Sequence, residues 1–105
     1  MADENLLARR LEWDDARTLA GESIELFPGD GAPPVVLDVT DAREVLSTPR
    51  MLQFRLLFRG PAARVHAQGI YRFRHARLGD YAFFITPVGA SADGTDYEAC
   101  FAHAR

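Results

Sequence analysis

The sequence predicts an all-β protein, a small and mostly antiparallel six-stranded barrel or sandwich with a short N-terminal helix. From Ser23 to the C-terminus, apolar and polar residues alternate in short segments, which is the pattern of strands with one buried face. Glycines, prolines and aspartates separate these segments, as they do at strand connections. Short links between consecutive strands favour antiparallel pairing. The 105 residues are typical of one domain, with a β core over residues 23–102.

The N-terminal part predicts helix rather than strand. Residues 1–12 are expected to be a tail or a helix, because two leucines four positions apart would share a helix face. Residues 13–21 are expected to form a short helix, since Asp14 and Asp15 suit its start and Gly21 suits its end.

Each strand is predicted from its own alternation. In chain order, the predicted strands are residues 23–26, 35–40, 54–59, 71–74, 81–88 and 97–101. A loop rich in proline and glycine over residues 28–34 separates the first two strands. The polar stretch Asp41–Arg50 is predicted to be a connection, and residues 89–96 are predicted to be a turn around Asp93 and Gly94.

The apolar positions of these strands define a predicted core. The inward set is Ile24, Leu26, Val35, Leu37, Val39, Phe54, Leu56, Phe58, Tyr71, Phe73, Phe83, Ile85, Tyr97 and Phe101. Burying a side chain of this size contributes about 1.5–3 kcal/mol, so the set can offset the ordering entropy of a small chain. Leu57 and Phe84 fall on the opposite face, and we expect leucines of the N-terminal segment or a second subunit to cover them.

Composition excludes several classes of protein. The formal net charge of −3 argues against nucleic-acid binding by bulk charge. No apolar run approaches the roughly 18–20 residues of a membrane span, and the acidic N-terminus lacks the apolar stretch of a secretory signal. A single cysteine excludes a disulfide framework within the chain. These features predict a soluble, cytoplasmic protein that has no membrane partner.

No residue pattern predicts a catalytic site, a cofactor or a metal site. Cys100 lies in a strand between apolar neighbours, and no serine stands in a Gly-x-Ser-x-Gly turn. His66, His75 and His103 lack the spacing of paired metal ligands. All twelve basic residues are arginine, which excludes lysine Schiff-base chemistry and a Walker-type phosphate site. The glycines of residues 29–31 precede two prolines, so no helix N-terminus is presented to a phosphate.

A stripe of arginines is the strongest remaining signal for binding. It consists of Arg55, Arg59, Arg72 and Arg74, on the non-core face of two strands that we expect to be neighbours. Together these side chains could bind a phosphate, a nucleic-acid backbone or an acidic partner. The alternative is cross-strand pairing with Glu25, Asp38 and Glu98, and the negative net charge favours this alternative.

The second half of the chain carries short motifs in a fixed order. They are FRLLFRGP at residues 54–61, QGIY at 68–71, His75, LG at 78–79, Phe84, PVG at 87–89, Gly94 and YEACF at 97–101. With residues 14–24, they resemble a family of small bacterial proteins defined only as a domain of unknown function, over roughly residues 11–102. The departure is His66-Ala67, where that family has Leu-Pro, which changes the geometry of a loop. The resemblance carries over no catalytic residue. Members of that family are often encoded beside proteins that resemble phage-tail collar domains, so the resemblance implies an accessory role in an assembly.

Three functional hypotheses follow. The first is a non-enzymatic protein-binding or assembly-accessory module that uses Leu57 and Phe84 as an interface, with a protein partner or a second copy. The alternative is a barrel that binds a small ligand or anion through the arginine stripe, either as a binding protein or as an enzyme. Binding of single-stranded nucleic acid is the weakest hypothesis, because the aromatic residues on the arginine-bearing strands fall on the core face.

Overall fold

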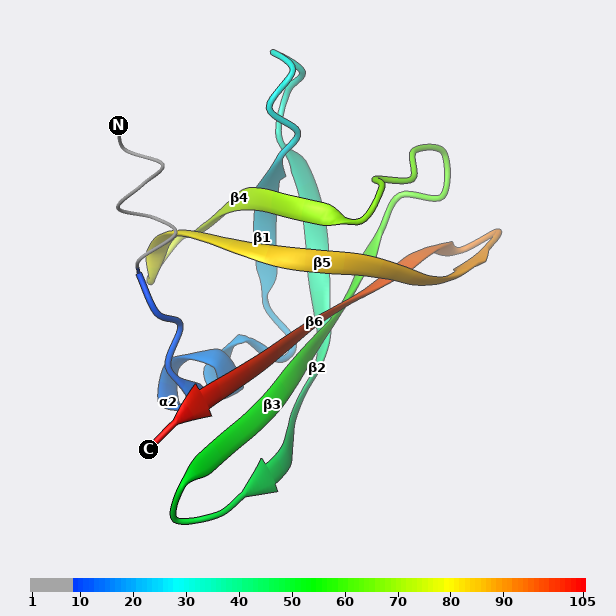
Figure 1. Cartoon of the computed structure of the whole chain (residues 1–105). Coiled ribbons are helices and arrows are strands. Elements are labelled where there is room, and N and C mark those ends of the chain that lie inside the picture. The colour runs from blue at the N-terminus through cyan, green and yellow to red at the C-terminus, as the bar shows by residue number, and fades with distance from the viewer. Residues whose placement is uncertain (1–8) are drawn as a thin grey trace.

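The computed structural model describes residues 9–105, which form a closed barrel of six antiparallel strands with a short N-terminal helix (Figure 1). Around the barrel the strand order is β1-β2-β3-β6-β5-β4, and β4 pairs with β1 to close the ring. The predicted fold class is therefore confirmed, and the structure favours a barrel over a sandwich. The predicted tail or helix over residues 1–12 lies mostly outside the described residues, and residues 9–12 are not helical.

The described elements are a short helix, a 3-10 turn and six strands. They are α2 (Trp13–Ala16), the 3-10 turn η1 (Arg17–Leu19), β1 (Ser23–Phe27), β2 (Val35–Ser47), β3 (Met51–Gly60), β4 (Gly69–His75), β5 (Gly79–Ser91) and β6 (Gly94–Ala104). Asp14 and Asp15 occupy the first turn of α2, where a carboxylate is favourable. Gly21 has a φ of 86°, so it turns the chain out of the helical segment into β1.

The two 13-residue strands, β2 and β5, are each shared between two parts of the barrel wall. In β5, Gly79–Ile85 pair with β4, whereas the residues from Thr86 to Ser91 pair with β6. The exchange of partners lies next to a β-bulge between Pro87 and Gly89. A bulge bends a strand and also tolerates a proline, which has no N–H to donate. As a result, the start of β5 and the end of β6 diverge from each other (Figure 1).

The stretch Asp41–Arg50, predicted to be a connection, is mostly strand. β2 continues to Ser47, and a tight turn leads into β3, with the Thr48 backbone N–H donating to the carbonyl oxygen of Met51 at 2.8 Å. This prediction was wrong because the second half of β2 pairs with β3 along one edge only and projects beyond β1. From Arg43 to Ser47 its side chains are therefore exposed on both faces, and no apolar alternation marks the strand.

The predicted inward set fills the barrel. Ile24, Leu26, Leu37, Val39, Phe54, Leu56, Phe58, Phe73, Phe83, Ile85 and Tyr97 are buried, and Val35, Tyr71 and Phe101 are partly buried and pack against them. The N-terminal segment adds Leu11 and Leu19, which are buried in the same core. The Trp13 ring lies with its centroid 5.1 Å from that of Phe54. The helical segment is thus part of the hydrophobic core.

The β5–β6 hairpin is tighter than the predicted turn over residues 89–96, because β5 runs to Ser91 and β6 begins at Gly94. Gly94 has a φ of 155° and lies against β3. A Cβ at this position would lie 2.6 Å from the carbonyl oxygen of Gly60 and 2.9 Å from Cγ of Arg59. Only glycine allows the two strands to approach this closely.

We predict that Gly94→Ala destabilises the protein by roughly 2–4 kcal/mol, because it combines backbone strain with a steric clash. Gly69→Ala is the matched control, since a Cβ there would meet only Cε2 of Tyr71, at 3.9 Å. Denaturant unfolding followed by the fluorescence of the single tryptophan, Trp13, measures both variants. Equal stability of the two variants would contradict the prediction.

Candidate functional site

The four arginines of the predicted stripe are separated by the strand order. β3 carries Arg55 and Arg59 and pairs with β2 and β6, whereas β4 carries Arg72 and Arg74 and pairs with β1 and β5. The prediction that these two strands are neighbours is wrong, because residues 61–68 carry the chain across to the other side of the barrel. The four side chains therefore form two separate pairs and no common cationic patch.

Three of these arginines donate hydrogen bonds to carboxylates. The bonds are Arg55–Glu98 at 3.2 Å, Arg59–Asp96 at 2.9 Å and Arg74–Asp80 at 2.7 Å. Glu98 is a predicted partner, whereas Glu25 and Asp38 lie opposite Arg74 and Arg59 in register and receive no hydrogen bond from them in the described part of the chain. The bonds from Arg74 and Arg59 lower the pKa of Asp80 and of Asp96. These arginines cross-link the outer surface of the barrel.

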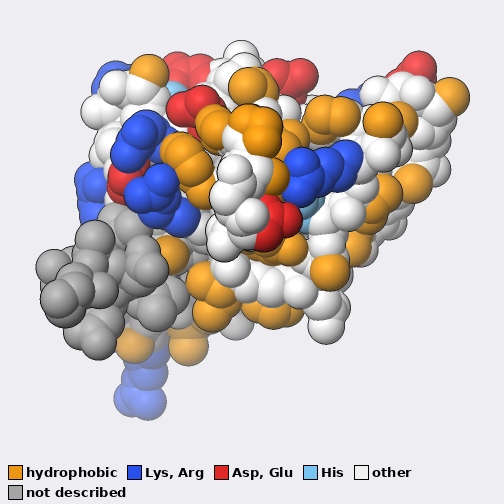
Figure 2. Space-filling view, turned by 90° about the horizontal axis from the view of Figure 1, so that it is seen from above, with side chains coloured by type: hydrophobic (Ala, Val, Ile, Leu, Met, Phe, Trp, Pro, Cys, Tyr) orange, Lys and Arg blue, Asp and Glu red, His pale blue; other side chains and the backbone are white. Residues whose placement is uncertain are grey.

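The outer face of β1, β4 and β5, hereafter the β1–β4–β5 face, changes from charged to apolar along the strands. Its rows are Glu25–Arg74–Asp80, then Phe27–Arg72–Ala82, then Ile70–Phe84. Ile70 is 60% exposed and Phe84 is 49% exposed. The guanidinium carbon of Arg72 lies 4.1 Å from the centroid of the Phe27 ring. Seen from above, apolar side chains gather between two groups of arginines (Figure 2).

Leu57, the other residue predicted for an interface, lies away from Phe84. It is half-buried on β3, opposite Asp41 of β2 and Glu98 of β6, and β6 separates β3 from β5. The exposed apolar neighbour of Phe84 is Ile70 instead. Alternation missed Ile70 because the predicted strand begins one residue later.

The N-terminal segment crosses the opening where β5 and β6 diverge. The Arg9 guanidinium donates to the carbonyl oxygens of Leu78 and Asp80, both at 2.7 Å, and so binds the start of β5. Nη2 of Arg10 donates to the carbonyl oxygen of Ala104 at 3.4 Å, at the end of β6. Leu11 follows them and enters the core. Two arginine side chains therefore bridge strands that no longer pair with each other.

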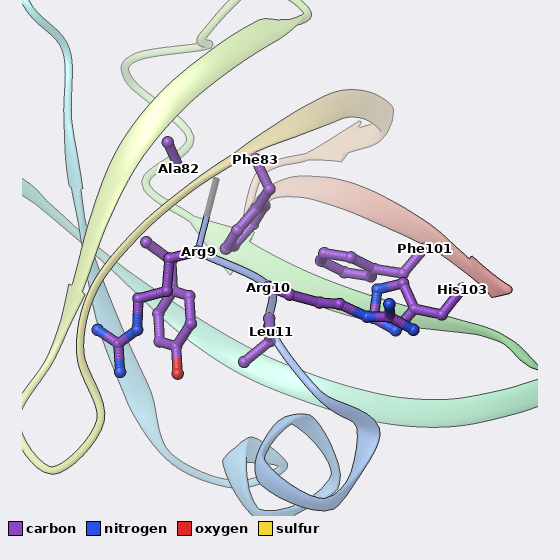
Figure 3. Close-up of a pocket in the computed structure, with 8 residues that line it drawn as sticks. Arg9, Arg10, Leu11, Ala82, Phe83, Phe101 and His103 are labelled. Carbon is purple, nitrogen blue, oxygen red and sulfur yellow. The ribbon is translucent and has the colours of Figure 1, made fainter. Parts of the chain in front are cut away.

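A cavity of about 250 Å³ remains in this opening, hereafter the seam cavity (Figure 3). It is lined by Arg9, Arg10, Leu11, Tyr81, Ala82, Phe83, Phe101 and His103. Arg10 extends toward Phe101 and His103 (Figure 3). The Arg9 guanidinium instead lies 4.0 Å from the centroid of the Tyr81 ring. The seam cavity thus has aromatic walls and one basic edge.

His75 belongs to a polar network that fastens the β4–β5 turn to the segment after η1. Its Nδ1 accepts hydrogen bonds from the backbone N–H groups of Arg77 and Leu78, at 3.2 and 3.1 Å. The proton of a neutral ring must therefore be on Nε2, which donates to Glu22 at 2.6 Å. The His75 hydrogen bond, together with Arg77, lowers the pKa of Glu22. The geometry is that of a structural cross-link.

His66 lies in the loop that joins β3 to β4 and is buried, with 6% of its surface exposed. Its backbone N–H donates to the hydroxyl oxygen of Tyr97 at 2.9 Å. Within the described residues, its Nε2 is buried without a hydrogen-bond partner. Burial, assisted by the positive charge of Arg64, lowers the pKa of His66, so the ring is held neutral.

Nothing in the described residues activates a nucleophile or assembles a metal site. Desolvation by neighbouring atoms and the carboxylate of Glu98 raise the pKa of the Cys100 thiol, which disfavours the reactive thiolate. No three histidine, cysteine, aspartate or glutamate side chains among residues 9–105 converge to hold a metal ion. No helix in that range is long and apolar enough to cross a membrane.

We predict that the protein loses stability as the pH falls below about 6.5, because the unfolded chain protonates His66 more readily than the folded chain does. A His66→Leu variant should therefore lose less free energy of unfolding than the wild type between pH 7 and pH 5. Denaturant unfolding at both values of pH measures this difference. Equal losses in the two proteins would show that protonation of His66 does not oppose folding.

The part of the chain that matches a known protein family is almost the same as the part that forms the fold. The family described as Domain of unknown function (DUF6916) matches residues 11–101, which include α2 and almost the whole barrel. Neither curated proteins nor solved structures gave a match. The chain therefore belongs to the DUF6916 family.

Proposed function

We propose that the chain is a non-enzymatic protein-binding module that docks its partner on the β1–β4–β5 face. The observation that carries the proposal is the pair Ile70 and Phe84, which lie opposite each other in register and are both exposed. An exposed aromatic residue beside an exposed β-branched residue forms a cohesive apolar surface across two strands. Surfaces of this kind are common where proteins bind one another.

The residues next to this pair supply a polar anchor. Arg72 stacks on Phe27, and arginine and aromatic residues are enriched at the energetic centres of protein interfaces. Asp80 holds Arg74 with two hydrogen bonds, at 2.7 and 3.0 Å, but lies 4.0 Å from Arg72. The Arg72 guanidinium therefore keeps donors for a further carboxylate. The partner that fits this face combines apolar side chains with an acidic group.

We propose that the chain acts as an accessory component of a larger protein assembly, such as a phage-tail-like assembly. The family resemblance suggests that role, and a small barrel with one apolar outer face suits a component that docks on others. The proposal places the chain in the bacterial cytoplasm, where the single exposed thiol of Cys100 stays reduced. The raised pKa of that thiol supports a non-enzymatic role.

We predict that Phe84→Ser weakens partner binding at least about tenfold, as removal of an interface anchor does. Val45→Ser is the matched control, because Val45 is 57% exposed but lies on the projecting part of β2. The protein and both variants are immobilised, and proteins retained from the native host are quantified. Light scattering on a sizing column reports whether the partner is a second copy.

The expected result is one or more proteins retained equally by the wild type and Val45→Ser, and lost with Phe84→Ser. A wild type that is strictly monomeric and retains nothing contradicts the proposal. Retention that is the same for all three proteins contradicts it as well, because binding would then not involve the β1–β4–β5 face.

A further inference from the structure

We infer that the seam cavity is a binding site for small aromatic carboxylates. Its location follows from the fold, since the pairing of β5 with β6 stops at Thr86 and Glu98. Beyond that point, the two strands diverge and, among the described residues, the segment Arg9–Leu11 lies between them. The segment narrows the opening and leaves a cavity of about 250 Å³.

The walls of the seam cavity favour an aromatic ring. The rings of Phe83 and Phe101 meet edge to face, with centroids 5.4 Å apart and planes at 66°. Leu11 and Tyr81 extend this apolar lining. A planar ring placed among such side chains gains from stacking and edge contacts as well as from leaving water.

One edge of the cavity favours an anion. The Arg10 guanidinium has five N–H donors, of which Nε faces the carboxylate of Glu12 at 2.9 Å and Nη2 makes one long contact, of 3.4 Å, to Ala104. His103 borders the same edge, with its Nδ1 3.9 Å from the carboxylate of Glu12, and none of the described lining residues is itself acidic. The remaining donors of Arg10 can therefore bind a carboxylate. Arg9 is directed away from this edge, because its two Nη atoms donate to the carbonyl oxygens of Leu78 and Asp80 and its guanidinium lies over the Tyr81 ring.

The volume restricts the ligand to a small one. Sites for drug-sized ligands and cofactors usually occupy roughly 300–1,000 Å³, and the seam cavity is below that range. It therefore suits one ring that carries a short carboxylate group, such as phenylacetate, and excludes a nucleotide. This site is separate from the exposed pair Ile70 and Phe84, since Phe83 points inward and Phe84 points outward from the same strand.

The test is a titration of the full chain with phenylacetate, followed by two-dimensional NMR and by thermal shift. Phenylacetamide is the probe that lacks the charge, and acetate is the probe that lacks the ring. We expect saturable shifts of the resonances of Phe83, Phe101 and His103 with phenylacetate, and at least about tenfold weaker binding of both other probes.

An Arg10→Gln variant should weaken phenylacetate binding at least about tenfold. Arg43→Gln is the matched control, because Arg43 is also exposed and also pairs with a carboxylate two residues away, that of Asp41 at 2.9 Å. It should change the affinity less than twofold. Absence of saturable binding at 10 mM phenylacetate would overturn the inference. Equal binding of phenylacetamide would also overturn it, and this arm requires no variant to fold.

Discussion

Strand β5 changes its hydrogen-bonding partner midway, and the rest of the molecule depends on that change. A six-stranded barrel is so narrow that its strands must bend strongly to close the ring. In β5 the bend comes at Pro87–Gly89, where a bulge replaces regular pairing. On one side of the bend, the strand presents Phe84 outward beside Ile70 of β4. At the neighbouring position, Phe83 points inward and lines the opening toward β6.

The opening would weaken the barrel if the N-terminal segment did not close it. The described part of that segment forms no strand, yet it buries Leu11 in the core and packs Trp13 against it. Trp13 contacts Phe54, whose ring stacks on Phe101 with centroids 4.8 Å apart. Arg9 meanwhile ties the segment to the start of β5. Because side chains rather than backbone hydrogen bonds close the opening between β5 and β6, unfilled space remains there, and this space is the seam cavity.

The sequence predicted which residues face inward and that consecutive strands pair, as β1-β2, β2-β3, β4-β5 and β5-β6 do. It did not predict that β3 pairs with β6 and that β4 pairs with β1. Side chains alternate between faces whatever the partner strand is, so the core positions followed from spacing alone. Strand order depends on where the chain crosses the barrel, and residues 61–68 carry no signal for that crossing. The arginines of β3 and β4 were therefore placed on the correct face and wrongly joined into one stripe. Arg10 gave no signal at all, because it lies in an extended segment without periodicity.

Both candidate sites contain an arginine that lies beside an aromatic ring, a feature that the net charge of the chain does not reveal. Asp96 and Asp80 each bind one edge of the Arg59 and Arg74 guanidinium groups through two hydrogen bonds, so the charge of each of these arginines is already paired with a carboxylate. Arg72 instead lies over the ring of Phe27, 4.0 Å from the nearest carboxylate. Arg10 pairs with Glu12 through Nε, and its terminal amino groups lie beside Phe101 and His103 (Figure 3). A guanidinium next to an aromatic surface is weakly hydrated and still donates, so it discriminates acidic, apolar ligands better than an exposed ion pair does. In a chain with a net charge of −3, recognition of this kind depends on local geometry, and an overall positive field is not required.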